Sequence, residues 1–280
     1  MSTALAVIGG GNMARAILEG ATRAGVLGEH VIVADPSPDR RRLFVHAVAT
    51  AREAIEQLAR IEPSPGVGQI LLAVKPQVLP EVAENVQPVL ESDLWGSCRV
   101  VISILAGATC RRVRDAFAGR AHVVRVMPNT PALIGRGMAA MCLGEQTSPE
   151  EAALARRLFE AVGRLIDVRE DQMDAFTAVG GSGPAYVFRL AEAMVRGAVE
   201  AGLDPADALL TVRETIAGAG LLLGQAAEEP RELRERVTSR GGTTAAALEV
   251  MELAGLEEIL VRAIIAARNR GAELSRLAGG

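Results

Sequence analysis

A glycine-rich segment near the start of the chain has the residue types and the spacing that bind a dinucleotide. Gly9, Gly11 and Ala14 form the pattern Gly-x-Gly-x-x-Ala, directly after an apolar stretch and at the start of a helical pattern. The first glycine allows a tight turn, the second lets the backbone approach the pyrophosphate, and the alanine lets the helix pack on the strand. The anion then rests on the exposed N–H groups of the helix start. Asp35 ends a second apolar stretch 21 residues after Ala14, which is the context that this fingerprint requires.

The residues around Asp35 give opposing indications about the cofactor. An acidic residue at this place accepts hydrogen bonds from the ribose 2′-OH and favours NAD. Ser37 follows closely, and Arg40, Arg41 and Arg42 are near enough to neutralise a 2′-phosphate, which favours NADP. The alternative for the three arginines is a solvated first turn of a helix.

Two residue types occur once each and lie beside other unusual segments. Lys75 is the only lysine among 30 Lys and Arg residues, and Tyr186 is the only tyrosine. A lone lysine in an arginine-rich chain indicates a place where a compact ammonium is needed and a planar guanidinium will not serve. The alternatives are chance and, for Lys75, a solvated lysine at a strand end.

A second glycine-containing segment could hold a small anion. Gly241, Gly242, Thr243 and Thr244 precede the helical pattern Ala245–Leu253, so their N–H groups belong to a helix N-terminus. Such a terminus is a cradle for a carboxylate that requires no cation. The alternative is plain N-capping by one of the two threonines.

The first half of the chain must position these segments through alternating strands and helices. Apolar stretches predict strands at Leu5–Ile8, Val31–Ala34, Gln69–Val74, Val100–Ile104 and His122–Val126, with further strands around Met138–Cys142 and Arg164–Val168. Helical patterns such as Met13–Gly25 and Pro80–Leu90 lie between them. Alternating strands and helices predict an α/β fold, a Rossmann-type doubly wound parallel sheet covered on both faces.

The second half predicts an all-helical domain. Helical patterns cover Pro184–Glu200, Pro205–Gln225, Thr243–Leu253 and Glu257–Leu277. Pro184, Pro205 and Pro230 sit at first-turn positions, where a missing N–H costs nothing, while Gly202 and Gly255 sit where helix C-caps are expected. The smooth Ala217–Gly220 stretch predicts close helix packing, either against a second subunit or within the chain. We therefore expect a dinucleotide-binding domain over residues 1–168 and a helical domain over residues 169–280.

Composition excludes several classes of function. The 280 residues are 49% hydrophobic, 23% charged and only 2% aromatic, with a net charge of −4. Nucleic acid is not an expected partner because basic clusters backed by aromatic residues are missing. Cys98, Cys110 and Cys142, like the histidines, are scattered without metal-ligand spacing, so no metal is expected. No apolar run reaches the roughly 20 residues of a membrane span, and a reducing, cytoplasmic location is expected.

Five segments, taken in order, resemble those of the pyrroline-5-carboxylate reductase family. They are Gly9–Ala14, Ala73–Gln77, Arg125–Pro131, Gly181–Tyr186 and Val237–Thr244. The resemblance spans nearly the whole chain, and the last segment is the most specific, because many dehydrogenases share the first. It implies NAD(P)H-dependent reduction of 1-pyrroline-5-carboxylate to L-proline, the last step of proline biosynthesis. It also implies that the helical domain forms a homodimer or a ring of dimers.

The residues present suit this chemistry. Reducing a cyclic imine requires a hydride on carbon and a proton on nitrogen, and a protonated imine is already electrophilic, so catalysis is mainly positioning. Carried over from the family, the substrate residues are Gly241, Gly242, Thr243 and Thr244, with Glu170 facing the site. Thr244 would lie near the imine nitrogen, and Thr244 and Lys75 are the predicted catalytic residues. The predicted cofactor residues are Gly9, Gly10, Gly11, Asn12, Met13, Asp35, Ser37, Val74, Lys75, Pro76, Ala106, Asn129 and Thr130. NADPH is expected to be modestly favoured, with NADH also accepted.

The chain departs from the family pattern at several positions. Arg240 stands where the family usually has Pro, and Gly180 replaces a usual Ser. The stretch Ile61–Gly68 looks like an insertion before the third strand. Thr50 and Ala51 stand where an Asn is often found, which leaves the adenosine pocket and the cofactor preference open.

Two rival functions fit part of the pattern. A β-hydroxyacid dehydrogenase shares the architecture, but that family uses a lysine from the helical half, which this chain lacks. A cofactor-bound sensor without turnover would keep the glycine fingerprint, and an NAD(P)H oxidation assay with pyrroline-5-carboxylate separates it from the reductase.

Overall fold

A computed structural model describes residues 4–64 and 66–277 and divides them between two compact units. The first unit takes its described residues from Met1–Ser182 and Ala267–Gly280, and the second is Gly183–Ala266. The predicted domain division after residue 168 stays a prediction. No helix among the described residues has the length and the apolar character needed to cross a bilayer.

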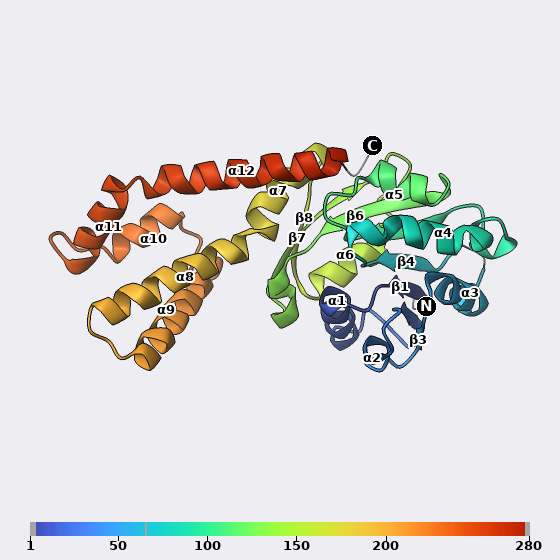
Figure 1. Ribbon diagram of the computed structural model, residues 1–280, viewed down its shortest axis with the longest axis horizontal. Helices are drawn as coiled ribbons and strands as arrows, with labels where there is room; N and C mark the ends of the chain where they lie inside the picture. Colours follow the sequence, from blue (N-terminus) through green and yellow to red (C-terminus); the bar gives the residue numbers. More distant parts are fainter. Residues whose placement is uncertain (1–3, 65, 278–280) are drawn as a thin grey trace. The chain divides into compact units, whose positions relative to one another are not determined.

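The first unit is built on an eight-stranded sheet (Figure 1) with the order β3-β2-β1-β4-β5-β6-β7-β8. The strands are β1 (Leu5–Ile8), β2 (Val31–Ala34), β3 (Ala47–Val48), β4 (Gln69–Leu72), β5 (Arg99–Ser103), β6 (Ala121–Met127), β7 (Gly137–Leu143) and β8 (Gly163–Asp167). The first six are parallel and keep the order 3-2-1-4-5-6 of a dinucleotide fold, whose order reverses between β1 and β4. All seven predicted strands are present, whereas β3 was missed because its two residues carry too little pattern.

One strand corrects the expectation of a wholly parallel sheet. β7 runs antiparallel to β6, with Arg125 opposite Cys142, and β8 then runs parallel to β7. A continuous apolar run indicates burial on both faces but does not encode strand direction. The short connection from β6 to β7 contains only a 3₁₀ turn, Thr130–Ile134. Such a connection is too short for the crossover that a parallel pair requires.

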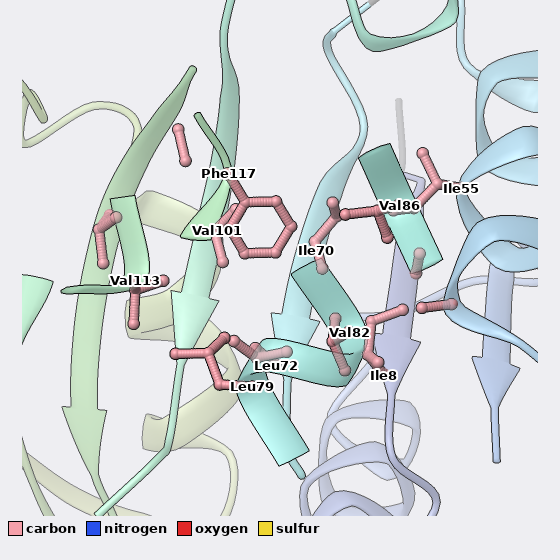
Figure 2. Close-up of a cluster of buried hydrophobic side chains, with 14 of the residues drawn as sticks. Ile8, Ile55, Ile70, Leu72, Leu79, Val82, Val86, Val101, Val113 and Phe117 are labelled. Carbon is pink, nitrogen blue, oxygen red and sulfur yellow. The ribbon is translucent and has the colours of Figure 1, made fainter. Parts of the chain in front are cut away.

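Helices cover both faces of the sheet because successive strand residues point to opposite sides. They are α1 (Asn12–Arg23), α2 (Pro38–Arg41), α3 (Ala51–Ile61), α4 (Leu79–Leu90), α5 (Cys110–Ala116) and α6 (Ala153–Glu160). Ile8, Ile70 and Leu72 pack with α3, α4 and α5 in one core (Figure 2). Leu5 and Val7 pack with α1 and α6 in the other. This layering holds the carboxyl ends of the parallel strands rigidly in place.

A buried ion pair involves the stretch that was predicted to be an insertion, Ile61–Gly68. Arg99 donates to both carboxylate oxygens of Glu62, at 2.8 and 2.9 Å, and both side chains are fully buried. Glu62 also accepts the N–H groups of Gly66 and Gly68. Burial alone would raise the pKa of Glu62, but the Arg99 guanidinium and these N–H groups together hold it below its ordinary value. Gly66 and Gly68 are therefore held by a carboxylate that is itself paired with Arg99.

The first unit ends in a continuous helical run. A 3₁₀ turn (Glu170–Gln172), α7 (Met173–Phe176) and a π turn, Thr177–Gly181, lead without a break into α8 (Gly183–Glu200). Ser182 has helical backbone angles, φ −87° and ψ −20°, so it does not cap a new helix. Pro184 lacks the N–H that an α-helix would direct at the carbonyl of Gly180. That carbonyl instead accepts a hydrogen bond of 2.8 Å from Asn129 Nδ2.

Packing also explains the glycine at position 180, where the family usually has Ser. A Cβ on Gly180 would lie 2.5 Å from the ring of Phe176, closer than real Cβ atoms approach other heavy atoms.

The second unit is entirely helical and buries little of itself. It contains α8, α9 (Pro205–Gln225), α10 (Pro230–Arg236), α11 (Thr243–Leu253) and the part of α12 (Leu256–Leu277) that precedes residue 267. Of its residues, all of which are described, only Ala208 and Val212 are buried among the hydrophobic ones. Pro205 and Pro230 begin their helices, and Gly202 and Gly255 take positive φ just after helix ends, as predicted. A Cβ on Gly218 or Gly220 would meet no atom within 4 Å, so within the second unit, all of which is described, no other helix packs closely at these two glycines.

Candidate active site

The glycine loop between β1 and α1 leaves its backbone open toward a ligand. Gly9 has φ +103°, and a Cβ there would lie 2.7 Å from the carbonyl oxygen of Ala73. Only glycine fits this close approach of two strand ends. Gly11 is the N-cap of α1 without a side-chain cap, and a Cβ on it would meet nothing within 4 Å. The first N–H groups of α1 are thus available to an anion.

The loop opens onto a cavity of about 720 Å³ at the carboxyl ends of β1, β2 and β4. This is where the strand order reverses, the normal binding crevice of such a sheet. Seven of the predicted cofactor residues line it: Gly9, Gly10, Gly11, Asn12, Asp35, Val74 and Lys75. The cavity is large enough for an extended cofactor.

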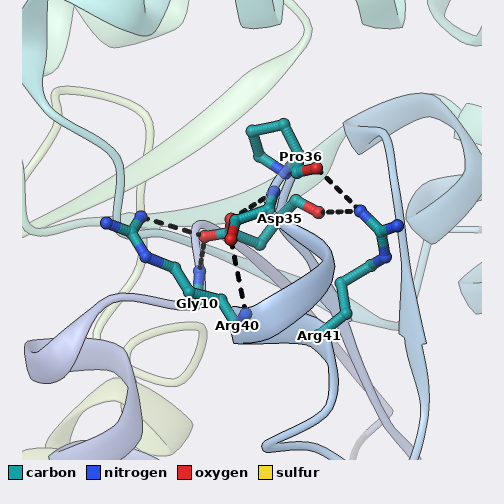
Figure 3. Close-up of polar contacts among 6 residues, drawn as sticks. Gly10, Asp35, Pro36, Arg40 and Arg41 are labelled. Atoms are coloured by element: carbon teal, nitrogen blue, oxygen red, sulfur yellow. Dashed lines mark hydrogen bonds and ion pairs between the residues drawn. The ribbon is translucent and has the colours of Figure 1, made fainter.

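Asp35 ties the glycine loop to the end of β2 (Figure 3). It is only 2% exposed. Its Oδ2 accepts the N–H of Gly10 at 2.9 Å, and its Oδ1 accepts the N–H of Ser37 at 2.9 Å. Arg40 Nη1 lies 3.4 Å from Oδ2 and forms an ion pair across the cavity wall. The Asp35 carboxylate therefore holds the backbone of the glycine loop. A ribose hydroxyl could bind only to the lone pairs of Asp35 that these hydrogen bonds leave free.

The three arginines after β2 have three different roles. Arg40 lines the cavity and is 59% exposed in its side chain. Arg41 Nη1 donates to the backbone carbonyls of Asp35 and Pro36, at 2.9 and 2.8 Å, and so braces the turn. Arg42 pairs with Asp39 on the surface, away from the cavity lining. Of the three arginines, Arg40 alone lines the cavity.

Lys75 is exposed at the end of β4 and lines the same cavity. It immediately precedes the 3₁₀ turn Pro76–Val78 and has extended backbone angles. No ion pair joins it to another residue of the described chain. Its ammonium is thus available to a ligand in the cavity.

Sequence reasoning missed Asn85 on α4, which lines the cavity. Its Oδ1 accepts the N–H of Arg52 at 2.8 Å, while Thr50 caps α3 in a reciprocal pair with Glu53. Thus an asparagine does line the cavity beside Thr50 and Ala51, but from another helix. Asn85 could have been predicted from the sequence, because Val78, Val82 and Asn85 lie on one face of a helix at helical spacing.

The remaining predicted cofactor residues do not line this cavity. Met13 packs against the core, Ser37 caps α2, and Pro76 and Thr130 each begin a 3₁₀ turn. Ala106 is exposed just after β5.

Both polar atoms of the Asn129 side chain form hydrogen bonds within the protein. Its Nδ2 donates to Gly180, and its Oδ1 accepts the N–H of Met138 at 2.9 Å. Asn129 is only 8% exposed. The residue therefore ties the end of β6 to β7 and to the π turn.

Glu170 has partners of its own within the first unit. Its Oε1 accepts the N–H of Cys110 at 2.7 Å and a hydrogen bond from Arg125 Nη1 at 3.1 Å. It lines a separate cavity of about 380 Å³, together with Cys110. Its predicted role in substrate binding stays a prediction.

The start of α11 is uncapped. Gly241 has φ +70°, and Gly242 is the N-cap, with no side-chain hydrogen bond to the helix. Thr243 and Thr244 are the first two helical residues, so neither takes the capping position. Within the described chain, no hydrogen bond of either threonine hydroxyl is formed, and Thr244 is half-buried. The free N–H groups and the two hydroxyls form one polar cluster that suits a small anion.

Comparisons with known proteins cover both halves of the chain. Residues 170–274 match the family described as "Pyrroline-5-carboxylate reductase dimerisation", and residues 4–107 match "NADP oxidoreductase coenzyme F420-dependent". A pyrroline-5-carboxylate reductase of Synechocystis is 38% identical, with 99% of this chain and 100% of that protein covered.

Two solved structures agree with these matches. A pyrroline-5-carboxylate reductase of Coxiella burnetii has a TM-score of 0.85 and 32% identity, covering 98% of this chain and 99% of the other. A pyrroline carboxylate reductase of Plasmodium falciparum, solved with NADP bound, has a TM-score of 0.80 and 26% identity, covering 98% of each chain.

Proposed function

The chain belongs to the pyrroline-5-carboxylate reductase family, and from this premise we propose which of its residues carry out the reduction of 1-pyrroline-5-carboxylate to L-proline. The activity has two requirements, a cofactor held in an extended crevice and a small anionic imine held against it. Residues of the first unit hold the cofactor, and the start of α11 holds the imine.

The cavity at the ends of β1, β2 and β4 fits NADP. Gly11 leaves open the space that a Cβ would fill, and the uncapped N–H groups of α1 face a pyrophosphate. Arg40 receives a 2′-phosphate and Asn85 an adenosine, while Lys75 binds along the crevice from β4. NADH also binds, since Asp35 retains acceptor capacity for a 2′-OH. The reduced nicotinamide supplies the hydride.

The start of α11 holds the substrate. The substrate carboxylate accepts hydrogen bonds from the free N–H groups that follow Gly242, and the helix dipole favours its charge. The Thr244 hydroxyl hydrogen-bonds near the imine nitrogen and fixes which carbon faces the hydride donor. A protonated imine requires no nucleophile, so these residues act by positioning. The uncapped helix start is the observation that carries this assignment.

The helical unit joins subunits. Its exposed apolar side chains and the open face at Gly218 and Gly220 suit close packing against a second copy. The match to a dimerisation family supports oligomerisation, and we propose a homodimer that can associate further into a ring. All three cysteines are free thiols, as is usual in a reducing compartment, and we propose a cytoplasmic location.

A direct assay tests the activity and the assignment together. Purified protein should oxidise NADPH when given pyrroline-5-carboxylate and form proline, with NADH as a parallel arm. Turnover indistinguishable from the blank with both cofactors would remove the enzyme function and leave a binding protein.

A further inference from the structure

A cluster of two thiols and one carboxylate lies outside the cofactor cavity. Cys110 begins α5, Cys142 lies on β7, and Glu170 begins the 3₁₀ turn after β8. The two Sγ atoms are 4.0 Å apart, and one ligand atom from each of the three residues lies within 4.8 Å of the others. Cys110 and Cys142 are 5% and 4% exposed. Two buried thiols and one half-exposed carboxylate thus converge within the first unit.

The separation of the ligand atoms matches a tetrahedral zinc site. With Zn–S bonds of about 2.3 Å and tetrahedral angles, the two sulfurs of such a site lie about 3.8 Å apart. The observed Sγ–Sγ distance of 4.0 Å is close to that value. The two sulfurs are therefore already spaced as zinc ligands, and the Glu170 oxygen lies within 4.8 Å of both.

The surrounding charges favour a divalent ion. Arg125, opposite Cys142 in the β6–β7 pair, holds the Glu170 carboxylate by Oε1, together with the N–H of Cys110. Both contacts orient the carboxylate and leave its other oxygen for a metal. A doubly charged ion with two thiolates, one carboxylate and one guanidinium has no net charge, so burial of the loaded site is not opposed.

Space for a fourth ligand is also present. The cavity of about 380 Å³ is lined by Cys110 and Glu170 and shares no lining residue with the cofactor cavity. Water that enters this cavity can complete the coordination.

We propose that Cys110, Cys142 and Glu170 bind Zn²⁺, with water as the fourth ligand. The ion joins α5, β7 and the turn that opens the helical run, and its role is structural because the site is separate from the cofactor cavity. The assignment of the cofactor cavity and of the start of α11 does not depend on this proposal, but Glu170 then serves as a zinc ligand and not as the substrate residue that the resemblance implied.

Metal binding is tested on the full chain after chelator treatment under reducing conditions. Co²⁺ should produce the thiolate charge-transfer band and the visible bands of tetrahedral coordination, and one equivalent of Zn²⁺ should abolish them. Zinc should also protect Cys110 and Cys142, but not Cys98, from alkylation, as read by peptide mass spectrometry. The absence of both effects in the unmodified chain would overturn the proposal and leave the cysteines as a thiol–thiol contact.

Variants locate the ion. Cys110→Ser and Cys142→Ser should each weaken zinc binding at least ~10-fold, corresponding to about 1.4 kcal/mol. Cys98→Ser is the matched control and should bind zinc as the natural chain does. NADPH oxidation reports that each variant is folded, because neither cysteine lines the cofactor cavity. Equal zinc affinity in all three variants would show binding elsewhere and refute the site.

Discussion

Replacing Arg40 by Ala should separate the two cofactors. Arg40 lines the cavity, and its Nη1 lies 3.4 Å from the buried carboxylate of Asp35. A 2′-phosphate at this place gains a charge-assisted hydrogen bond, worth about 1.5–3 kcal/mol where it is well formed. The Arg40 side chain is 59% exposed, so solvent screening reduces this contribution. We therefore take about 1.4 kcal/mol, a tenfold rise in the KM for NADPH.

NADH should respond differently because it brings no phosphate to Arg40. Loss of the guanidinium leaves Asp35 with its bonds to Gly10 and Ser37 and with acceptor capacity for a 2′-OH. The KM for NADH should therefore change by less than about twofold, on the order of the error of such comparisons.

Initial rates with pyrroline-5-carboxylate, at varied NADPH and NADH, give both constants. Arg42→Ala is the matched control, since Arg42 pairs with Asp39 on the surface and does not line the cavity. Equal increases for NADPH and NADH in Arg40→Ala, or an Arg42→Ala variant that behaves like Arg40→Ala, would refute the reasoning.

Three further substitutions test the substrate site, the insertion and the assembly. Thr244→Ala should lower turnover at least ~10-fold, about 1.4 kcal/mol of barrier, with NADPH affinity unchanged and Thr244→Ser recovering most of the loss; normal turnover with a lower Tm would make the residue structural. Glu62→Gln leaves Arg99 buried and unpaired, so urea unfolding at pH 7 should show a loss of about 3–5 kcal/mol. Because the folded pKa of Glu62 is lowered, its contribution is present above the unfolded value of about 4.3 and is lost as pH falls through the folded pKa. The difference in unfolding free energy between the natural chain and Glu62→Gln should therefore become smaller as the pH falls below the unfolded pKa of Glu62. A difference that does not change with pH would contradict the ion pair. Gly220→Leu should overpack the subunit interface and lower solubility, measured by sedimentation of the soluble fraction, and a variant that stays a soluble oligomer like the natural chain would place the interface elsewhere.

The sequence predicted those parts of the fold whose determinants are local. Apolar runs marked the seven longer strands within about two residues at each end, an ordinary error for element boundaries. The direction of β7 was not predictable, because an apolar run indicates burial and does not show whether a strand is parallel or antiparallel to its neighbour. Nor was the π turn at Thr177–Gly181, in which the Gly180 carbonyl accepts a hydrogen bond from the distant Asn129.

The same distinction divides the site. The glycine loop was predictable because its turn, its close approach and its open N–H groups all depend on consecutive residues. The roles of Arg40, Arg41 and Arg42 were not, since all three follow one another over a single short turn. Which guanidinium faces the cavity depends on the side-chain directions around α2, and these are set by the carbonyls of Asp35 and Pro36.

The antiparallel direction of β7 also decides whether the two thiols can meet. Cys110 and Cys142 are separated by 32 residues and belong to a helix and a strand, so their spacing carries no ligand motif. Because β7 is antiparallel to β6, Cys142 stands opposite Arg125, whose guanidinium holds the carboxylate of Glu170. A parallel β7 would change this register and break the convergence of thiols, carboxylate and guanidinium. The zinc proposal thus depends on the feature of the sheet that could not be predicted from the sequence, and a cobalt spectrum of the natural chain tests whether the ligands that this feature brings together bind a metal.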